Sequence, residues 1–180
     1  MASTKEKKMN SVMLEKYINE YGKELYSFCV YLTRSRQYAD DLYQDTFLVA
    51  IEKDELDEDR NPKSYLISIA VNLWNNQKRK YMWRNKKAAI VYYQEENLEQ
   101  LAEDKETAEE QLIKKDEIEM VRRLVDGLPE KMRIVILMYY MQDMSVEEIA
   151  KTLKIPAGTV KSRMHQAKAR LKEGMVEYER

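Results

Sequence analysis

The chain has 180 residues, of which 44% are hydrophobic and 35% are charged, and its formal net charge is -1 at pH 7. This length allows one ordinary domain or two small ones, each with a modest core. The polar start MASTKEKKMN has no apolar signal-peptide segment, and no run of about 18 apolar residues occurs, so we expect a cytoplasmic protein without membrane insertion. The single Cys29 excludes an intramolecular disulfide and is typical of a small buried residue in a reducing compartment.

The composition predicts an all-α protein. The sequence contains only 4 Gly and 3 Pro, its apolar residues recur every three or four positions, and it shows no alternating strand pattern. Charge is unevenly distributed, because an acidic zone from Ala88 to Met120 lies between the basic segments QKRKYMWRNKK and KSRMHQAKARLK. Phosphate binding needs a local excess of positive potential rather than a basic average, so the net charge does not exclude nucleic acid as a partner.

Three helices are predicted in the first half of the chain. The first ends near TRSRQ and carries one apolar stripe: Leu14, Ile18, Tyr21, Leu25, Phe28 and Leu32. The second runs from about Tyr38 to Lys53 and buries Leu42, Phe47, Ala50 and Ile51, while Asp40, Asp41, Gln44, Asp45 and Leu48 lie mostly on its surface. A loop, DELDEDR, follows.

Asn61 and Pro62 start the third helix, because Asn can cap free N–H groups and proline is tolerated at the first helical position. Its expected buried residues are Tyr65, Leu66, Ile69, Ala70 and Leu73. From about Ala88 to Glu106 the periodicity fades and the chain becomes acidic, which indicates a partly disordered linker.

The second half is predicted to hold four more helices. Thr107 and Glu110 resemble a capping box that opens a helix ending near Gly127, and after Pro129 the segment MRIVILMYYM is apolar on nearly all sides, as expected of a central helix. Ser145 and Glu148 form a second capping-box pattern, before a helix whose inward residues are Val146, Ile149 and Leu153.

A short connection, KIPAG, then leads to a last helix from about Thr159, and this spacing is that of a helix-turn-helix. Val160, Met164, Ala167 and Leu171 share one face of the last helix. The opposite side carries Lys161, Ser162, His165, Lys168 and Lys172, with Arg163 and Arg170 at its margin. A recognition helix in the major groove needs such an acid-free face, although an ordinary solvated surface or another partner would also explain it.

No motif in the sequence indicates catalysis. One His165 and one distant Cys29 do not supply a metal-ligand set, so we expect no metal and no cofactor. The sequence has no Gly-rich phosphate loop, nucleophile elbow or convincing catalytic carboxylate pair, so we do not expect an enzyme.

Two blocks of sequence resemble a known family. LPEKMRIVILMYYMQDMSVEEIAKTLKIPAGTVKSRMHQAKARL is similar to region 4 of sigma-70-family factors of the extracytoplasmic-function (ECF) type. YADDLYQDTFLVAIEK and NPKSYLISIAVNLWNNQKRK are similar to their region 2. The resemblance implies a promoter-recognition subunit without chemistry of its own, which binds core RNA polymerase and helps to open DNA.

The resemblance also implies roles for residues of the first half. Asp41, Gln44 and Asp45 correspond to the polar face that engages the clamp helices of the largest polymerase subunit, although such a face is often simply solvated. The residues implied to face the -10 element are Asn72, Trp74, Asn76, Lys78, Arg79 and Lys80. Core packing is an equally good interpretation of Trp74, and the segment KDELDEDRNPKS resembles the part that accepts a flipped base.

Region 4 implies a surface for the -35 element, made of Thr159, Lys161, Ser162, Arg163 and His165, with Lys168 and Arg170 nearer phosphates. Two positions depart from the family pattern, because Val71 stands where Arg is common and Asn76 where Asp is common. Both departures affect the region that should face the -10 element.

The predicted organisation is therefore two small helical domains, a region 2-like bundle at 10–87 and a region 4-like helix-turn-helix at 107–176, joined by an acidic linker at 88–106. The expected partners are the clamp helices and flap of core RNA polymerase, promoter DNA and an anti-sigma factor. A stand-alone helix-turn-helix regulator and a helical protein-binding module are the alternatives.

Overall fold

A computed structural model of the chain describes residues 11–53, 61–84 and 108–178. Within these ranges it contains seven helices and no strand, which confirms the all-α prediction. The chain divides into two compact units, Met1–Asn97 and Leu98–Arg180. The acidic linker and the proposed base-accepting loop fall mainly on residues 85–107 and 54–60, outside the described residues, and the predicted domain boundaries stay a prediction. No helix in the described ranges combines the length and apolarity needed to cross a bilayer.

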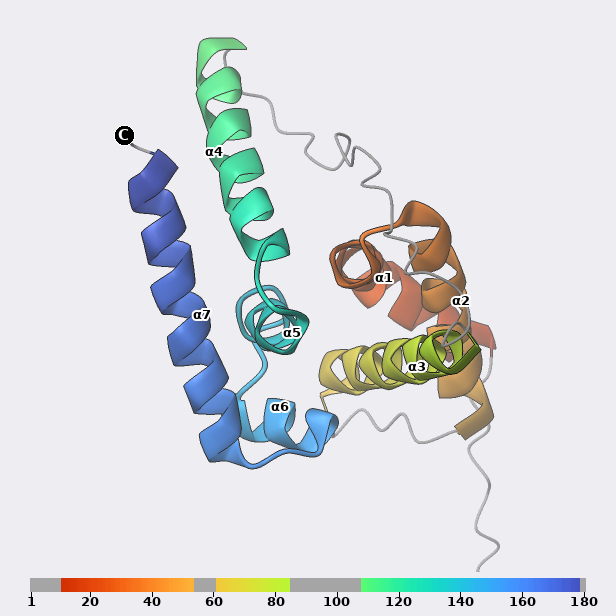
Figure 1. The fold of residues 1–180 in the computed structure, drawn as a ribbon. Helices are drawn as coiled ribbons and strands as arrows, with labels where there is room; N and C mark the ends of the chain where they lie inside the picture. The colour runs from red at the N-terminus through yellow and green to blue at the C-terminus, as the bar shows by residue number, and fades with distance from the viewer. Residues whose placement is uncertain (1–10, 54–60, 85–107, 179–180) are drawn as a thin grey trace, which may run out of the picture. The chain divides into compact units, whose positions relative to one another are not determined.

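The first unit is a bundle of three helices, α1 (Ser11–Thr33), α2 (Arg36–Lys53) and α3 (Pro62–Arg84), each packed against the other two (Figure 1). Its core contains large side chains from all three helices: Tyr17, Leu25, Phe28, Leu32, Leu42, Phe47, Leu66, Ile67 and Val71. Each of the three helices has one side in this core and another side exposed to solvent.

The apolar stripe predicted for α1 is partly wrong. Ile18 is 39% exposed, whereas Tyr17, which the prediction left out, is only 1% exposed. Because α1 packs against both α2 and α3, its buried face is wider than a single stripe, and near its end Phe28, Cys29 and Val30 are all buried.

α2 begins at Arg36 rather than at Tyr38. Arg34 takes a left-handed conformation with φ 59°, and its N–H donates to the carbonyl of Val30 over 2.9 Å, which closes α1. The carbonyl of Ser35 then accepts the first α2 hydrogen bond, from the N–H of Ala39, at 2.9 Å. Two residues therefore suffice for the turn.

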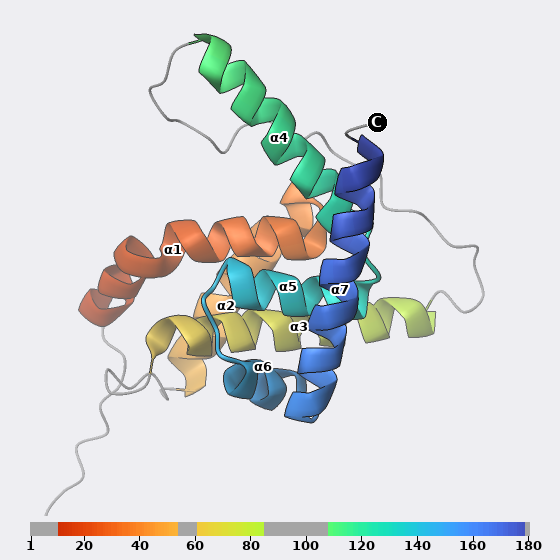
Figure 2. The ribbon, with the colours of Figure 1, turned by 90° about the vertical axis from the view of Figure 1, so that its left-hand side faces the viewer.

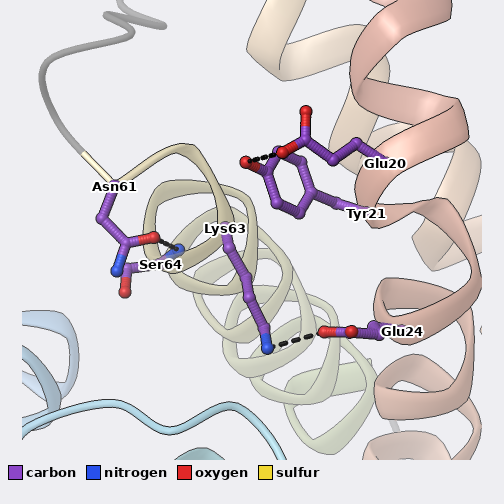
Figure 3. A network of polar contacts seen from close by, with 6 residues as sticks. All are labelled: Glu20, Tyr21, Glu24, Asn61, Lys63 and Ser64. Carbon is purple, nitrogen blue, oxygen red and sulfur yellow. Dashed lines mark hydrogen bonds and ion pairs between the residues drawn. The ribbon is translucent and has the colours of Figure 1, made fainter.

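The start of α3 is capped as predicted. The Oδ1 of Asn61 accepts a hydrogen bond of 3.2 Å from the N–H of Ser64, and in the same turn Lys63 Nζ lies 2.6 Å from Glu24 Oε2 on α1 (Figure 3). Also on α1, the hydroxyl of Tyr21 donates to Glu20 Oε1 over 2.7 Å. The ion pair between Lys63 and Glu24 joins the N-terminal end of α3 to α1.

The second unit contains α4 (Ala108–Asp126), α5 (Glu130–Tyr140), α6 (Val146–Leu153) and α7 (Ala157–Tyr178). Leu128, Ile136 and Ala167 form a buried cluster, with Met132 and Leu171 packed against it. As predicted, α5 is central, because every side chain from Arg133 to Met138 is buried. The C-terminal end of α4 packs against α7, and α4 leans away from α7 toward its own N-terminus (Figure 2). At this contact Gly174 lets Leu124 approach so closely that an added Cβ would overlap Leu124 Cδ2.

The helix-turn-helix is confirmed, with a shorter turn than expected. Both hydrogen bonds of the Ser145–Glu148 capping box are present at the start of α6, while Thr107 of the other predicted box lies outside the described residues. α6 ends at Lys154, which is left-handed with φ 55°. The carbonyl of Pro156 accepts hydrogen bonds from the N–H groups of Thr159 and Val160, so α7 begins at Ala157 and not near Thr159.

Candidate nucleic-acid and protein interfaces

The outer face of α7 carries the residues predicted to meet the -35 element. Val160, Met164 and Ala167 are buried, so the helix is fixed with its basic side outward. Five of the seven predicted residues are exposed on that side: Lys161, Ser162, His165, Lys168 and Arg170. The other two, Arg163 and Thr159, are half-buried. From Ala157 to Lys172 the helix contains no acid, so a phosphate approaching it meets no carboxylate of this segment.

A polar stripe on α2 carries the residues predicted to bind polymerase. Asp41 and Gln44 are exposed, and Asp45 is half-buried. Leu48 lies one turn beyond Gln44 and is 56% exposed, so it adds an apolar side chain to this stripe. The sequence had indicated that Leu48 is on the surface but gave it no role.

The neighbouring Asp40 is held from α1. The hydroxyl of Tyr26 donates to Asp40 Oδ1 over 2.8 Å, and this hydrogen bond, the largest cause, raises the pKa of Tyr26. The ring of Tyr26 also meets the ring of Tyr43 edge-on at 5.7 Å. These contacts between α1 and α2 set the orientation of the N-terminal half of the stripe.

α3 separates the residues predicted to face the -10 element into two groups. Asn72, Asn76 and Arg79 are exposed at i, i+4 and i+7, Lys78 is half-buried, and the guanidinium of Arg79 donates to Asn76 Oδ1. The side chain of Lys80 lies outside the described part of the chain.

Trp74 belongs to the other group, because it is only 4% exposed. Its ring centroid lies 6.1 Å from that of Tyr38 on α2, and Lys78 Nζ lies 6.0 Å from its centre. Of the two interpretations left open by the sequence, core packing describes this structure. A base could stack on the indole only after the covering groups move.

The thiol and the imidazole show no sign of a chemical site. Cys29 is fully buried on α1, and burial raises the pKa of its thiol to about 12, so it stays protonated at neutral pH. His165 is exposed on α7. Among the described residues, no group of three or more His, Cys, Asp or Glu side chains is placed to hold a metal ion.

Comparisons with known proteins match the two units separately. The family model "Sigma-70 region 2" matches residues 17–84, and "Sigma-70, region 4" matches residues 118–171. The chain is 27% identical to the ECF RNA polymerase sigma factor SigW of Bacillus subtilis, over 87% of this chain and 85% of that protein. It is 31% identical to the RNA polymerase sigma factor HrpL of Pseudomonas syringae, over 74% of this chain and 71% of HrpL.

The fold is also similar to that of solved sigma factors. The sigma factor RpoE of Bartonella quintana, crystallised with the anti-sigma factor NepR, superposes with a TM-score of 0.73 at 23% identity, over 89% of this chain and 95% of that one.

Proposed function

The chain belongs to the sigma-70 family, as an ECF-type sigma factor that directs transcription initiation, and on that premise we propose which of its surfaces meet polymerase and promoter DNA. The observation that carries the assignment of surfaces is the acid-free outer face of α7, presented by a capped helix-turn-helix. The same chain carries a region 2 bundle with a polar stripe on α2. DNA is therefore assigned to α7 and α3, and core polymerase to α2.

The α2 stripe is proposed to bind the clamp helices of the largest polymerase subunit. Asp41, Gln44 and Asp45 offer carboxylate and amide groups to cationic and polar partners, while the exposed Leu48 would be covered on binding. A side chain that becomes fully desolvated in an interface typically contributes more to affinity than groups that stay in contact with water.

Substitutions in the stripe test this assignment. The double variant Gln44→Ala, Asp45→Ala and the single variant Leu48→Ala should each weaken binding to core polymerase at least tenfold while the helical content stays unchanged. Asn19→Ala, which removes an exposed amide from α1, is the matched control. Unchanged affinity of both stripe variants would remove the clamp contact from α2.

The outer stripe of α3 is proposed to follow the -10 element. Asn72 and Asn76 can hydrogen-bond base edges, and Lys78 and Arg79 can pair with phosphates. Lys80 is kept among the residues proposed to face the -10 element, whereas Trp74 is left out of the proposed contacts because it is buried.

The outer face of α7 is proposed to read the -35 element through Thr159, Lys161, Ser162, Arg163 and His165, with Lys168 and Arg170 on phosphates. If Arg163 reads a base, Arg163→Ala should reduce discrimination between the promoter and a -35 mismatch by about 1–3 kcal/mol. Equal loss on every DNA sequence would place Arg163 on a phosphate instead.

The polymerase flap is assigned to the far ends of α4 and α7. Around the contact between Leu124 and Gly174, α4 exposes Ile118 and Val121, and the last turn of α7 exposes Met175, Val176 and Tyr178. Exposed apolar side chains so placed favour a protein partner over DNA. Val121→Asp should therefore weaken flap binding without changing the affinity of the protein for DNA.

An anti-sigma factor is the proposed regulatory partner, since RpoE of similar fold is bound by one. We further propose that the protein acts in the cytoplasm, where core polymerase and the chromosome are, and that it contributes recognition rather than catalysis to initiation.

The test of the whole assignment is transcription. Purified protein mixed with core RNA polymerase should give transcripts with discrete starts from a library of fragments of its own genome, and aligning those starts should reveal the -35 and -10 sequences. If an active core enzyme neither binds the protein nor starts transcription with it, the assignment fails and binding of DNA by the protein alone becomes the next measurement.

A further inference from the structure

Packing between α5 and α7 brings an exposed tyrosine beside one of the proposed phosphate contacts. Ile136 on α5 and Ala167 on α7 share the buried cluster of the second unit. Tyr140 lies one turn after Ile136, and Lys168 directly follows Ala167, so the helix register places the two side chains together at the edge of the core.

The two side chains are in contact. Lys168 Nζ lies 5.6 Å from the ring centre of Tyr140, and a hydrogen bond to the Tyr140 hydroxyl raises the pKa of Lys168. Tyr139 meets the Tyr140 ring edge-on, with a centroid distance of 5.0 Å and an interplanar angle of 78°. Tyr140 is itself 55% exposed, so the ammonium is held at the surface and not inside the unit.

A tyrosine holds a lysine differently from a carboxylate. On α4, Arg123 pairs with Glu119, and that carboxylate neutralises the cation. The Tyr140 hydroxyl accepts one hydrogen bond but adds no negative charge, so Lys168 keeps its full charge and two further N–H donors for a ligand. A lysine restrained in this way also has less rotamer freedom to lose when it meets a phosphate.

We propose that Tyr140 is a positioning residue, which holds the Lys168 ammonium on the DNA side of α7 for contact with a promoter phosphate. The inference rests on the proposed role of α7 at the -35 element and extends that surface to the C-terminal end of α5. Tyr140 acts through Lys168, because the ammonium of Lys168 lies against the Tyr140 side chain.

A double-mutant cycle on the holoenzyme tests this inference. Holoenzyme is assembled from core polymerase and each of four forms of the full chain: unaltered, Tyr140→Phe, Lys168→Ala and the double variant. Its affinity is measured at several KCl concentrations for the promoter fragment that gives the strongest transcript. Tyr140→Phe keeps the ring and its packing and removes only the hydroxyl, and thermal unfolding of each variant checks the fold.

The expected result is a loss that depends on Lys168. Lys168→Ala should lower the slope of log affinity against log salt by about one, as expected for one lost phosphate contact. Tyr140→Phe should weaken binding about threefold, the scale of one modest hydrogen bond, and should cause no further loss in the Lys168→Ala background. Lys131→Ala, which removes an exposed lysine at the start of α5, should change neither quantity.

Each other outcome overturns a distinct claim. If Lys168→Ala lowers the slope but Tyr140→Phe has no effect, Tyr140 does not position Lys168, and the proposed DNA surface stands. Equal losses from Tyr140→Phe in both backgrounds would show a role independent of Lys168 and would also overturn the inference. If Lys168→Ala leaves affinity and slope unchanged, the phosphate contact and the inference both fail, while the transcripts still test the sigma function.

Discussion

Gly22 lies inside α1 at a point where the helix is in close contact with Tyr43 of α2. A Cβ added to Gly22 would lie 2.8 Å from the Tyr43 hydroxyl oxygen, but 3.9 Å from the ring carbon that carries it and 3.6 Å from Ile18 Cγ2. Only the hydroxyl is therefore too close, since the other two distances are ordinary contacts. We predict that Gly22→Ala destabilises the unaltered protein and stabilises a Tyr43→Phe variant.

Two opposing effects set the size of the change in the free energy of unfolding caused by Gly22→Ala. Replacing glycine by alanine in a helix interior is worth about 1 kcal/mol of stability. The Tyr43 ring cannot move freely, because it meets Phe47 at 5.2 Å and Tyr26 at 5.7 Å, and forced overpacking of this kind costs about 1–3 kcal/mol. Gly22→Ala should thus lower the free energy of unfolding of the unaltered protein by about 1 kcal/mol, and raise that of the Tyr43→Phe variant by about 0.5–1 kcal/mol.

Tryptophan fluorescence during urea unfolding measures this difference. Both tryptophans, Trp74 and Trp83, belong to the first unit, so their emission follows unfolding of that unit alone. The four proteins of the cycle give the free energy of unfolding for each background, and near-equal slopes against urea would confirm that the same transition is compared. If Gly22→Ala changes stability in the same direction in both backgrounds, the hydroxyl contact does not control this position.

Three further predictions concern single side chains. Ser145→Ala should lower the stability of the second unit by about 1 kcal/mol, because it removes one hydrogen bond of the α6 capping box. Circular dichroism during urea unfolding measures this loss. Unchanged stability would mean that water replaces the missing hydroxyl. Burial raises the pKa of Cys29 to about 12, so between about pH 9 and 12 only the unfolded thiol loses its proton and stability falls as pH rises. The stability of the unaltered protein relative to Cys29→Ala should accordingly drop by about 1 kcal/mol from pH 8 to pH 10, and parallel pH profiles would contradict this burial effect. Trp74→Phe should leave promoter opening by the holoenzyme unchanged, since the indole is buried, and a large loss in permanganate footprinting of the open promoter would restore Trp74 as a stacking residue.

Local signals in the sequence predicted several features of the structure correctly. The Asn61 cap and the Ser145–Glu148 capping box could be predicted because each is complete within four residues. The outward face of α7 could be predicted because a helix with Val160, Met164 and Ala167 on one side has only one way to bury them.

Contacts between distant residues were not predictable in the same way. Whether Tyr17 or Ile18 is buried depends on α1 touching two helices at once, and whether Trp74 stacks on DNA or packs inside depends on Tyr38, which is far away in the sequence. The contact between Lys168 and Tyr140 likewise needs the register of α5 against α7. A single periodic stripe contains none of this information.

The two departures from the family pattern have different physical meanings. Val71 is fully buried, so replacing the common Arg by Val adds an apolar side chain to the core of the first unit, and the proposed promoter contacts fall to the exposed residues of α3. Asn76 is exposed and accepts a hydrogen bond from Arg79, a position from which an Asp would instead form an ion pair. The neutral amide orients the guanidinium without cancelling its charge, as the Tyr140 hydroxyl does for Lys168. On α3 and on α7 alike, a cation proposed to meet phosphate is therefore held by a neutral acceptor, so its positive potential remains available to DNA.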